Sequence, residues 1–231
     1  IEACLVGSEM CIRDSLVAMN MVGKYLDESF AFRDVPAAGS SEVPRAPSLG
    51  WRNTPQQCRH FTGKDMLPVV LEALRNMQES LIGLQYQSDH TECMNLINQK
   101  VAKGASVRLI FDRKNFKDSS CARQAPRMKE LYDNGAELRV LRPPQGGFSC
   151  MHVKTLVIDG KVLLTGSVNL THNGFEKNKE HLYRITDPSA IREVLDDFEK
   201  DWEGPEVEEV SEELMQEVMN CLLYTSPSPR D

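Results

Sequence analysis

The 231-residue sequence has few features of membrane-spanning, fibrous or disordered proteins. It has no run of 18 apolar residues, so no membrane-spanning helix is predicted. Its 14 glycines and 12 prolines form no collagen-like or other repeat. The remaining composition, 41% hydrophobic and 26% charged, is typical of a globular protein with one large or two small domains. The formal charge of −7 argues against non-specific coating of nucleic acid.

Both ends of the chain read like translated sequencing-adapter DNA. The segment 221–231, CLLYTSPSPRD, is the translation of a transposase-type adapter, and LVGSEMCIRDS from Leu5 is the translation of its reverse complement. The alternative is a genuine tail rich in Cys and Ser. We therefore expect residues 1–14 and 221–231 to lie outside the fold. A signal peptide, a membrane anchor or a further domain can then lie beyond either end.

The cysteines between these ends show no CxxC pair and no zinc-site spacing; they are Cys58, Cys93, Cys121 and Cys150. That pattern favours free thiols in a reducing compartment, and hence an intracellular location. No metal-ligand cluster is apparent from the sequence.

The segments between the ends alternate between helix and strand. Residues 15–61 are predicted to be irregular or a linker, since 36–56 is rich in Pro, Gly and Ser. Helical patterns follow in MLPVVLEALRNMQ, MNLINQKVAK and ARQAPRMKELYDNG, and strand patterns in SLIGLQYQ, SVRLIFD and ELRVL. Alternation with short connections predicts an α/β layered fold, a mixed sheet with helices on both faces.

The second half predicts a hairpin, a strand and a long helix. MHVKTLVID and KVLLTGS flank Asp159-Gly160, a strong hairpin signal, and EHLYRIT reads as a further strand. PSAIREVLDDFEKDWEG is amphipathic and begins with a proline, as helices often do. We expect residues 62–204 to form the functional domain and 205–220 an acidic tail.

Charge is segregated along the chain. Residues 98–129 hold nine Lys or Arg, and residues 193–217 hold twelve acidic residues. The simple interpretation is two solvated helix faces. The alternative is that the basic segment, with Arg113, Lys114 and Lys117, frames a groove for an anionic substrate.

A set of reactive side chains surrounds the predicted hairpin. His152 and Lys154 are two residues apart on a strand and therefore share a face. Folding the hairpin at Gly160 returns Ser167 and Asn169 to their side. An imidazole, an ammonium, a hydroxyl and a carboxamide that converge in this way suit a phosphate. Lys and Asn can hold its oxygens while the imidazole attacks phosphorus.

The spacing His152-x-Lys154-x4-Asp159-x6-Gly166-Ser167-x-Asn169 resembles the HKD motif of the phospholipase D superfamily, and the resemblance extends over roughly residues 62–203. It is similar to single-motif members such as cardiolipin hydrolases and bacterial endonucleases. The resemblance implies that His152 is a nucleophile that forms a phosphohistidine. It implies that Lys154 and Asn169 bind the phosphoryl oxygens with help from Ser167, and that no metal or other cofactor takes part.

The resemblance also gives roles to two carboxylates. Glu180 would accept a hydrogen bond from the far nitrogen of His152 and set its tautomer, although an exposed strand carboxylate is the simpler reading. Asp159 belongs to the motif, but it falls at the hairpin turn and is expected to support the structure. The other histidines are expected to make ordinary contacts, with His172 a further candidate because it lies near the motif.

The family's reaction uses two histidines, and this chain has one motif. Either two copies share a site in a homodimer, or a second motif lies beyond Asn220. The substrate is a phospholipid, with association at a membrane surface, or a nucleic acid. The charge balance favours the lipid. An inactive scaffold is a third reading, disfavoured because every reactive position is intact.

Overall fold

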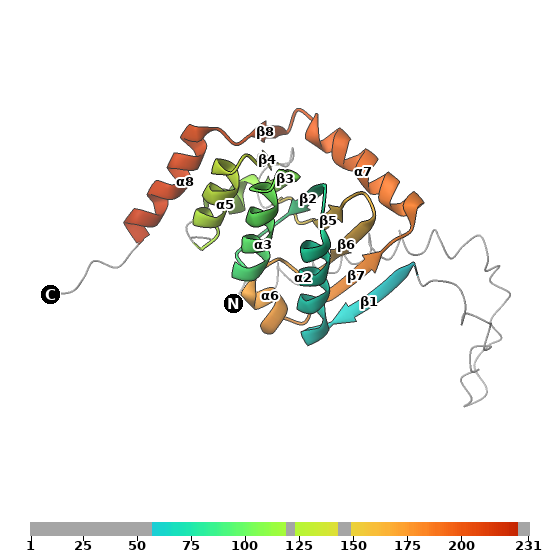
Figure 1. Cartoon of the computed structure of the whole chain (residues 1–231). Coiled ribbons are helices and arrows are strands. Elements are labelled where there is room, and N and C mark those ends of the chain that lie inside the picture. Colours follow the sequence, from blue (N-terminus) through green and yellow to red (C-terminus); the bar gives the residue numbers. More distant parts are fainter. Residues whose placement is uncertain (1–56, 119–122, 143–148, 226–231) are drawn as a thin grey trace, which may run out of the picture. The chain divides into compact units, whose positions relative to one another are not determined.

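An eight-stranded mixed sheet organises the described part of the chain, in the order β1-β7-β6-β5-β2-β3-β4-β8 (Figure 1). The computed structural model describes residues 57–118, 123–142 and 149–225, with side chains up to Asn220. Strands β2, β3 and β4 are parallel, and all other neighbours are antiparallel. The strands are Cys58–Thr62 (β1), Ser80–Gln85 (β2), Ser106–Asp112 (β3), Glu137–Leu141 (β4), Lys154–Ile158 (β5), Val162–Gly166 (β6), His181–Ile185 (β7) and Val207–Glu209 (β8).

Helices cover both faces of this sheet, which confirms the predicted α/β layered fold. Alternation along β5 shows the two faces, since Leu156 and Ile158 join one apolar cluster and Val157 joins another. Helices α2, α3, α5 and α8 pack on the first face and α7 on the second. The helices are Gly63–Asp65 (η2, a 3-10 turn), Met66–Asn76 (α2), Thr91–Val101 (α3), Arg113–Lys117 (α4), Ala125–Asp133 (α5), His172–Glu176 (α6), Pro188–Trp202 (α7) and Glu212–Thr225 (α8).

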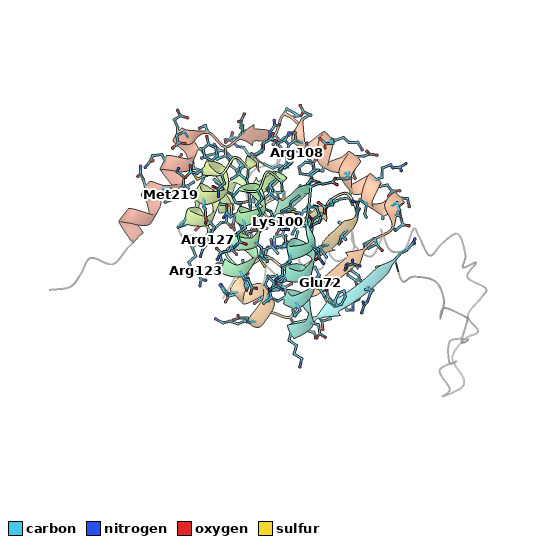
Figure 2. All side chains as sticks on the ribbon, in the orientation of Figure 1. Glu72, Lys100, Arg108, Arg123, Arg127 and Met219 are labelled. Carbon is cyan, nitrogen blue, oxygen red and sulfur yellow. The ribbon has the colours of Figure 1, made fainter. Side chains whose placement is uncertain are left out.

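Helix α7 begins and packs as its sequence predicts. The Asp187 side chain accepts a hydrogen bond from the Ala190 amide at 2.9 Å, and Pro188 occupies the first turn. The buried Phe198 and Trp202 face the sheet. Arg108, labelled in Figure 2, places its guanidinium 5.3 Å from the centroid of each of these rings. This cation stacking adds to the apolar contacts that hold α7 on the sheet.

The two edges of the sheet differ from the prediction. The segment 15–61 was expected to be irregular, yet Cys58–Thr62 is strand β1, paired with β7 from Cys58↔Ile185 to Thr62↔His181. Its pattern is mostly exposed, so little apolar alternation marks it, and the partner strand supplies its order. Residues 15–56 lie outside the described residues.

The predicted acidic tail, 205–220, also belongs to the fold. Val207–Glu209 forms β8 against β4, and Met215 and Val218 of α8 are buried in the main core. The many acidic residues around these few apolar positions conceal the amphipathic pattern in the sequence. Helix α8 continues to Thr225, so it enters the segment interpreted as adapter-derived.

One end of the sheet collects the loops that carry the candidate residues. The parallel strands β2, β3 and β4 end there, as does β6, whereas β5 and β7 begin there. The register shows this directly, since Gln85 lies opposite Lys154 and Gly166 lies opposite Leu182. Loops at such a sheet end are a common place for ligands in α/β proteins.

The described residues include no helix long and apolar enough to cross a membrane. Cys58, Cys93 and Cys150 are not joined in disulfides, in line with the prediction, and Cys121 lies outside the described residues.

Candidate active site

His152 and Lys154 lie at the start of β5, at the sheet end described above. The strand begins at Lys154, so His152 sits just before it rather than within it as predicted. The Lys154 ammonium donates to the carbonyl oxygen of His152 at 2.6 Å and lies 5.2 Å from the Tyr86 ring centroid. The same Tyr86 ring meets the His152 imidazole edge-on, with centroids 4.7 Å apart. Tyr86 therefore positions both reactive groups.

Lys154 is a buried cation, with only 5% of the residue exposed. An ammonium group has three donors and loses hydration when buried, so polar and aromatic neighbours must compensate for that loss. A buried positive charge beside an imidazole at the sheet end suits the binding of a phosphoryl group.

Asp112 fixes the chain just before His152. Its carboxylate accepts from the Met151 amide at 2.8 Å and from the Asn115 amide at 2.7 Å, where it caps α4. It is 1% exposed. Sequence reasoning missed Asp112 and Tyr86, because each acts on a segment far away in the chain. Asp112 is the last residue of the buried strand β3 and Tyr86 directly follows β2, and these places were the available signal.

Ser167 and Glu180 join the ends of β6 and β7. The Ser167 hydroxyl donates to the Glu180 carboxylate and accepts from the His181 amide at 3.0 Å. The other Glu180 oxygen accepts from Asn178 Nδ2 at 3.2 Å. The contact predicted for Glu180, a hydrogen bond with His152, is thus replaced by contacts with Ser167 and Asn178. Both new partners lie within the two loops that the sheet pairing brings together.

Gly166 permits this close approach of β6 and β7. A Cβ added there would lie 2.2 Å from the carbonyl oxygen of His181, so any side chain would push the strands apart. A glycine is required at this motif position for a steric reason, and Ser167 is held against His181 as a result.

Asn169 is brought to the same sheet end on the segment after β6. Its buried Oδ1 atom has no hydrogen-bond partner. Buried polar atoms are almost always satisfied in folded proteins, so such an atom is typical of a side chain whose partner is a ligand or water. The loop after β2 anchors this segment, since the amides of Asp89 and His90 both donate to the carbonyl oxygen of Leu170 at 2.9 Å.

Asp159 lies at the other end of β5, away from His152. With Gly160 it forms a two-residue turn in which both residues have positive φ, 52° and 60°. Its carboxylate accepts from the amides of Gln78, Glu79 and Ser80 at 2.8–2.9 Å. Partial burial raises its pKa, but these three backbone hydrogen bonds outweigh that effect and the net pKa is lowered. The geometry indicates a structural role, in which Asp159 joins the hairpin to the start of β2.

We predict that Asp159→Asn lowers the free energy of unfolding by about 1–3 kcal/mol at pH 7. Since folding lowers the pKa from 3.8, the carboxylate stabilises the protein above that value and loses its contribution as pH falls through the folded pKa. Urea unfolding should therefore show a large difference from wild type at pH 7 and a smaller one near pH 3. Wild-type stability combined with a strong loss of turnover would contradict the structural role.

The basic residues after β3 are largely paired with acidic residues. Arg113 Nε lies 2.5 Å from Glu208 of β8, and Lys117 Nζ lies 2.7 Å from Glu217 of α8. Lys114 is exposed. The segregated charges of the sequence therefore meet in the fold.

Together these residues place an imidazole, a buried ammonium group and polar groups at one sheet end. A phosphodiester held by Lys154 and the side-chain amide of Asn169 could be attacked by the His152 imidazole. The described residues also contain a separate cluster of side chains of the types that bind metal ions. It consists of His90, His172 and Glu176.

Residues 70–202 of this chain match the model of a protein family that is described as "Cardiolipin synthase, PLD-like domain". The human mitochondrial cardiolipin hydrolase is 38% identical over 161 residues, which are 69% of this chain and 60% of that protein. The dog protein of the same name is 27% identical over 168 residues, covering 70% of this chain and 58% of its own length. The chain thus spans less than two thirds of the length of these relatives.

Among solved structures, the fold resembles that of Nuc from Salmonella typhimurium, described as a phospholipase D family member. The TM-score is 0.57 at 19% sequence identity, and the match covers 66% of this chain and 97% of that one. At this identity the likeness bears on the fold.

Proposed function

The chain belongs to the phospholipase D superfamily, and from this premise we propose that it hydrolyses a phosphodiester through a covalent intermediate on His152. The family match covers every residue of the candidate site. The observation that carries the proposal is the joint placement of His152, the buried Lys154 and Tyr86 at the end of the sheet.

The reaction has two steps on this arrangement. In the first, a ring nitrogen of His152 forms a bond to phosphorus, the bond to the leaving oxygen breaks, and a general acid protonates that oxygen. In the second, water attacks phosphorus on the opposite side from His152, gives a proton to the same acid–base group, and displaces the imidazole. Lys154 and Asn169 stabilise the negative charge on the phosphoryl oxygens in both steps.

Glu180 acts in this scheme through Ser167. The carboxylate accepts a hydrogen bond from the Ser167 hydroxyl and so fixes its orientation. The lone pairs of Ser167 Oγ then point toward the His181 amide, which donates to them. Ser167 and Glu180 therefore hold the ends of β6 and β7 in place, and Asn169 follows directly.

The general acid in this proposal is a second copy of His152. One imidazole cannot be both the covalent nucleophile and the acid within a single step, and the chain carries one motif. A homodimer with two-fold symmetry would place the two histidines on opposite sides of one phosphate.

We predict that mixing wild type with an equal amount of His152→Ala protein lowers the activity per wild-type subunit. If subunits exchange at random and mixed dimers are inactive, the activity of the wild-type subunits falls by about half. Activity is measured after subunit exchange, and sedimentation is used to establish the dimer. Unchanged activity, or a fully active monomer, would contradict the shared site.

For the substrate we propose a phospholipid, such as cardiolipin or another phosphatidyl lipid. The observation that favours it is the neutralisation of the basic segment, in which Arg108, Arg113 and Lys117 pair with Glu199, Glu208 and Glu217. Binding of a long nucleic acid relies on unmatched cations along its backbone. In addition, Val153, between His152 and Lys154, is 45% exposed and presents an apolar side chain at the site.

An endonuclease is the second candidate. Lys177 and Lys179 are exposed beside Glu180 and could contact nucleic acid phosphates. A catalytically inactive scaffold would need a defect at a reactive position, and each of those positions holds the residue type that the chemistry requires.

The full chain is assayed on vesicles of phosphatidylcholine with cardiolipin, and in parallel on single-stranded DNA. We expect cleavage of the lipid, lost in His152→Ala. As a matched test of the apolar contact, Val153→Ser should reduce cleavage of vesicles more than cleavage of a soluble short-chain phosphodiester. Cleavage of DNA with the lipid intact would establish the endonuclease, and no cleavage of either substrate would favour the scaffold.

A further inference from the structure

His90, His172 and Glu176 form a compact cluster next to the candidate active site. Their ligand-type atoms all lie within 4.8 Å of one another. The two imidazole rings are 4.4 Å apart between centroids, and His172 Nδ1 lies 3.8 Å from Glu176 Oε1, one helical turn along α6. Spacing in the sequence conceals this cluster, because His90 caps the N-terminus of α3 and the other two residues lie on α6.

The backbone around the cluster is held from several sides. The Leu170 carbonyl accepts from both Asp89 and His90, and Asp89 Oδ1 accepts from the His172 amide at 3.3 Å. Arg123, labelled in Figure 2, lies 3.5 Å from the other oxygen of the buried Asp89. These hydrogen bonds fix the backbone that carries His90 and His172.

His90 is the buried member of the cluster, with 4% of the residue exposed. Burial raises the pKa of the adjacent Cys93 thiol to about 12, which makes this sulfur a poor ligand.

We propose that His90, His172 and Glu176 bind one divalent transition-metal ion, with Zn²⁺ the best match. Two imidazoles and one carboxylate are a common zinc ligand set, and hard cations such as Mg²⁺ prefer oxygen ligands. Tetrahedral zinc places its ligand atoms about 3.3 Å apart, so side chains now within 4.8 Å need to close by about 1.5 Å at most. Binding would also replace the long 3.4 Å contact from the Cys93 amide to His90 Nδ1.

The metal would act as a structural link and stand apart from the chemistry at His152. It would join the start of α3 to α6 and hold the segment 169–172, which carries Asn169. The proposal does not depend on the phosphodiesterase function, because its test is metal binding itself.

The full chain is stripped of metal, and zinc is then titrated against a chromophoric chelator. We expect one tight zinc site. His172→Gln and Glu176→Gln should each lower the zinc affinity by more than about 100-fold, because loss of a residue that only supports a ligand lowers the affinity by at most about that factor. Both side chains are partly exposed, so these variants should fold. The matched control is His60→Gln, an exposed histidine that stacks on His181 and lies outside the cluster.

The absorption spectrum of the protein with Co²⁺ bound in place of Zn²⁺ identifies the types of ligand atom. The bound ion should show visible bands of a nitrogen and oxygen ligand set, without the near-ultraviolet charge transfer of thiolates. Zinc should raise the melting temperature of wild type and of His60→Gln but leave that of His172→Gln nearly unchanged. A wild-type chain without a tight site, or a tight site that persists in both cluster variants, would overturn the proposal.

Discussion

His152→Ala is expected to reduce turnover by at least about 10⁴-fold, since removal of a covalent nucleophile abolishes the two-step route. The His152 ring is half-buried and contacts Tyr86 at the sheet end, outside the main core. The variant should therefore fold, with a melting temperature close to that of wild type. Turnover is measured under saturating substrate for both proteins.

His60→Ala is the matched control for this experiment. His60 is an exposed histidine on β1, and its loss should change turnover little. If His152→Ala kept more than a small fraction of wild-type turnover, a different residue would have to be the nucleophile.

Lys154→Ala is expected to slow the reaction by about 10²-fold or more, mainly in kcat, because the charge on the phosphoryl oxygens is greatest in the transition state. The residue is buried, so truncation also removes packing. Lys154→Met keeps most of the stem and removes the charge, and it should show a similar loss in kcat with a smaller loss in stability.

Lys161→Met is the control for general charge effects, as Lys161 is an exposed lysine in the same hairpin. It should retain wild-type kcat. A loss in Lys154→Met that appears only in KM would contradict a role for Lys154 in the transition state and would leave it a role in binding.

Local sequence patterns predicted much of the fold. Strands β3 and β4 coincide with SVRLIFD and ELRVL, because continuous apolar runs flanked by turn residues identify buried strands. The hairpin turn also lies at Asp159-Gly160, where positive φ at both residues favours this pair. The motif could be located because its residues lie close in sequence on either side of that turn.

Features that depend on distant segments were not predicted. Strand β1 has little apolar alternation and is ordered by its pairing with β7. Asp112 reaches the Met151 amide from another strand. His90 meets His172 because its loop is hydrogen-bonded to Leu170 and, through Asp89, to the His172 amide. No spacing within one element signals such contacts, since they arise from the order of strands in the sheet.

The predicted contact between Glu180 and His152 illustrates the same limit. The resemblance suggested the pair, whereas the close approach at Gly166 brings Ser167 to Glu180. The partner of this side chain follows from how closely β6 and β7 approach each other, which no local sequence pattern gives.

The stereochemical course at phosphorus tests the covalent route most directly. A phosphorothioate diester of known configuration, in the substrate class that the protein cleaves, is hydrolysed in ¹⁸O-water, and the configuration of the product is determined. Two successive in-line displacements, first by His152 and then by water, predict retention of configuration. Inversion would show that water attacks phosphorus in a single step, and it would contradict a phosphohistidine intermediate.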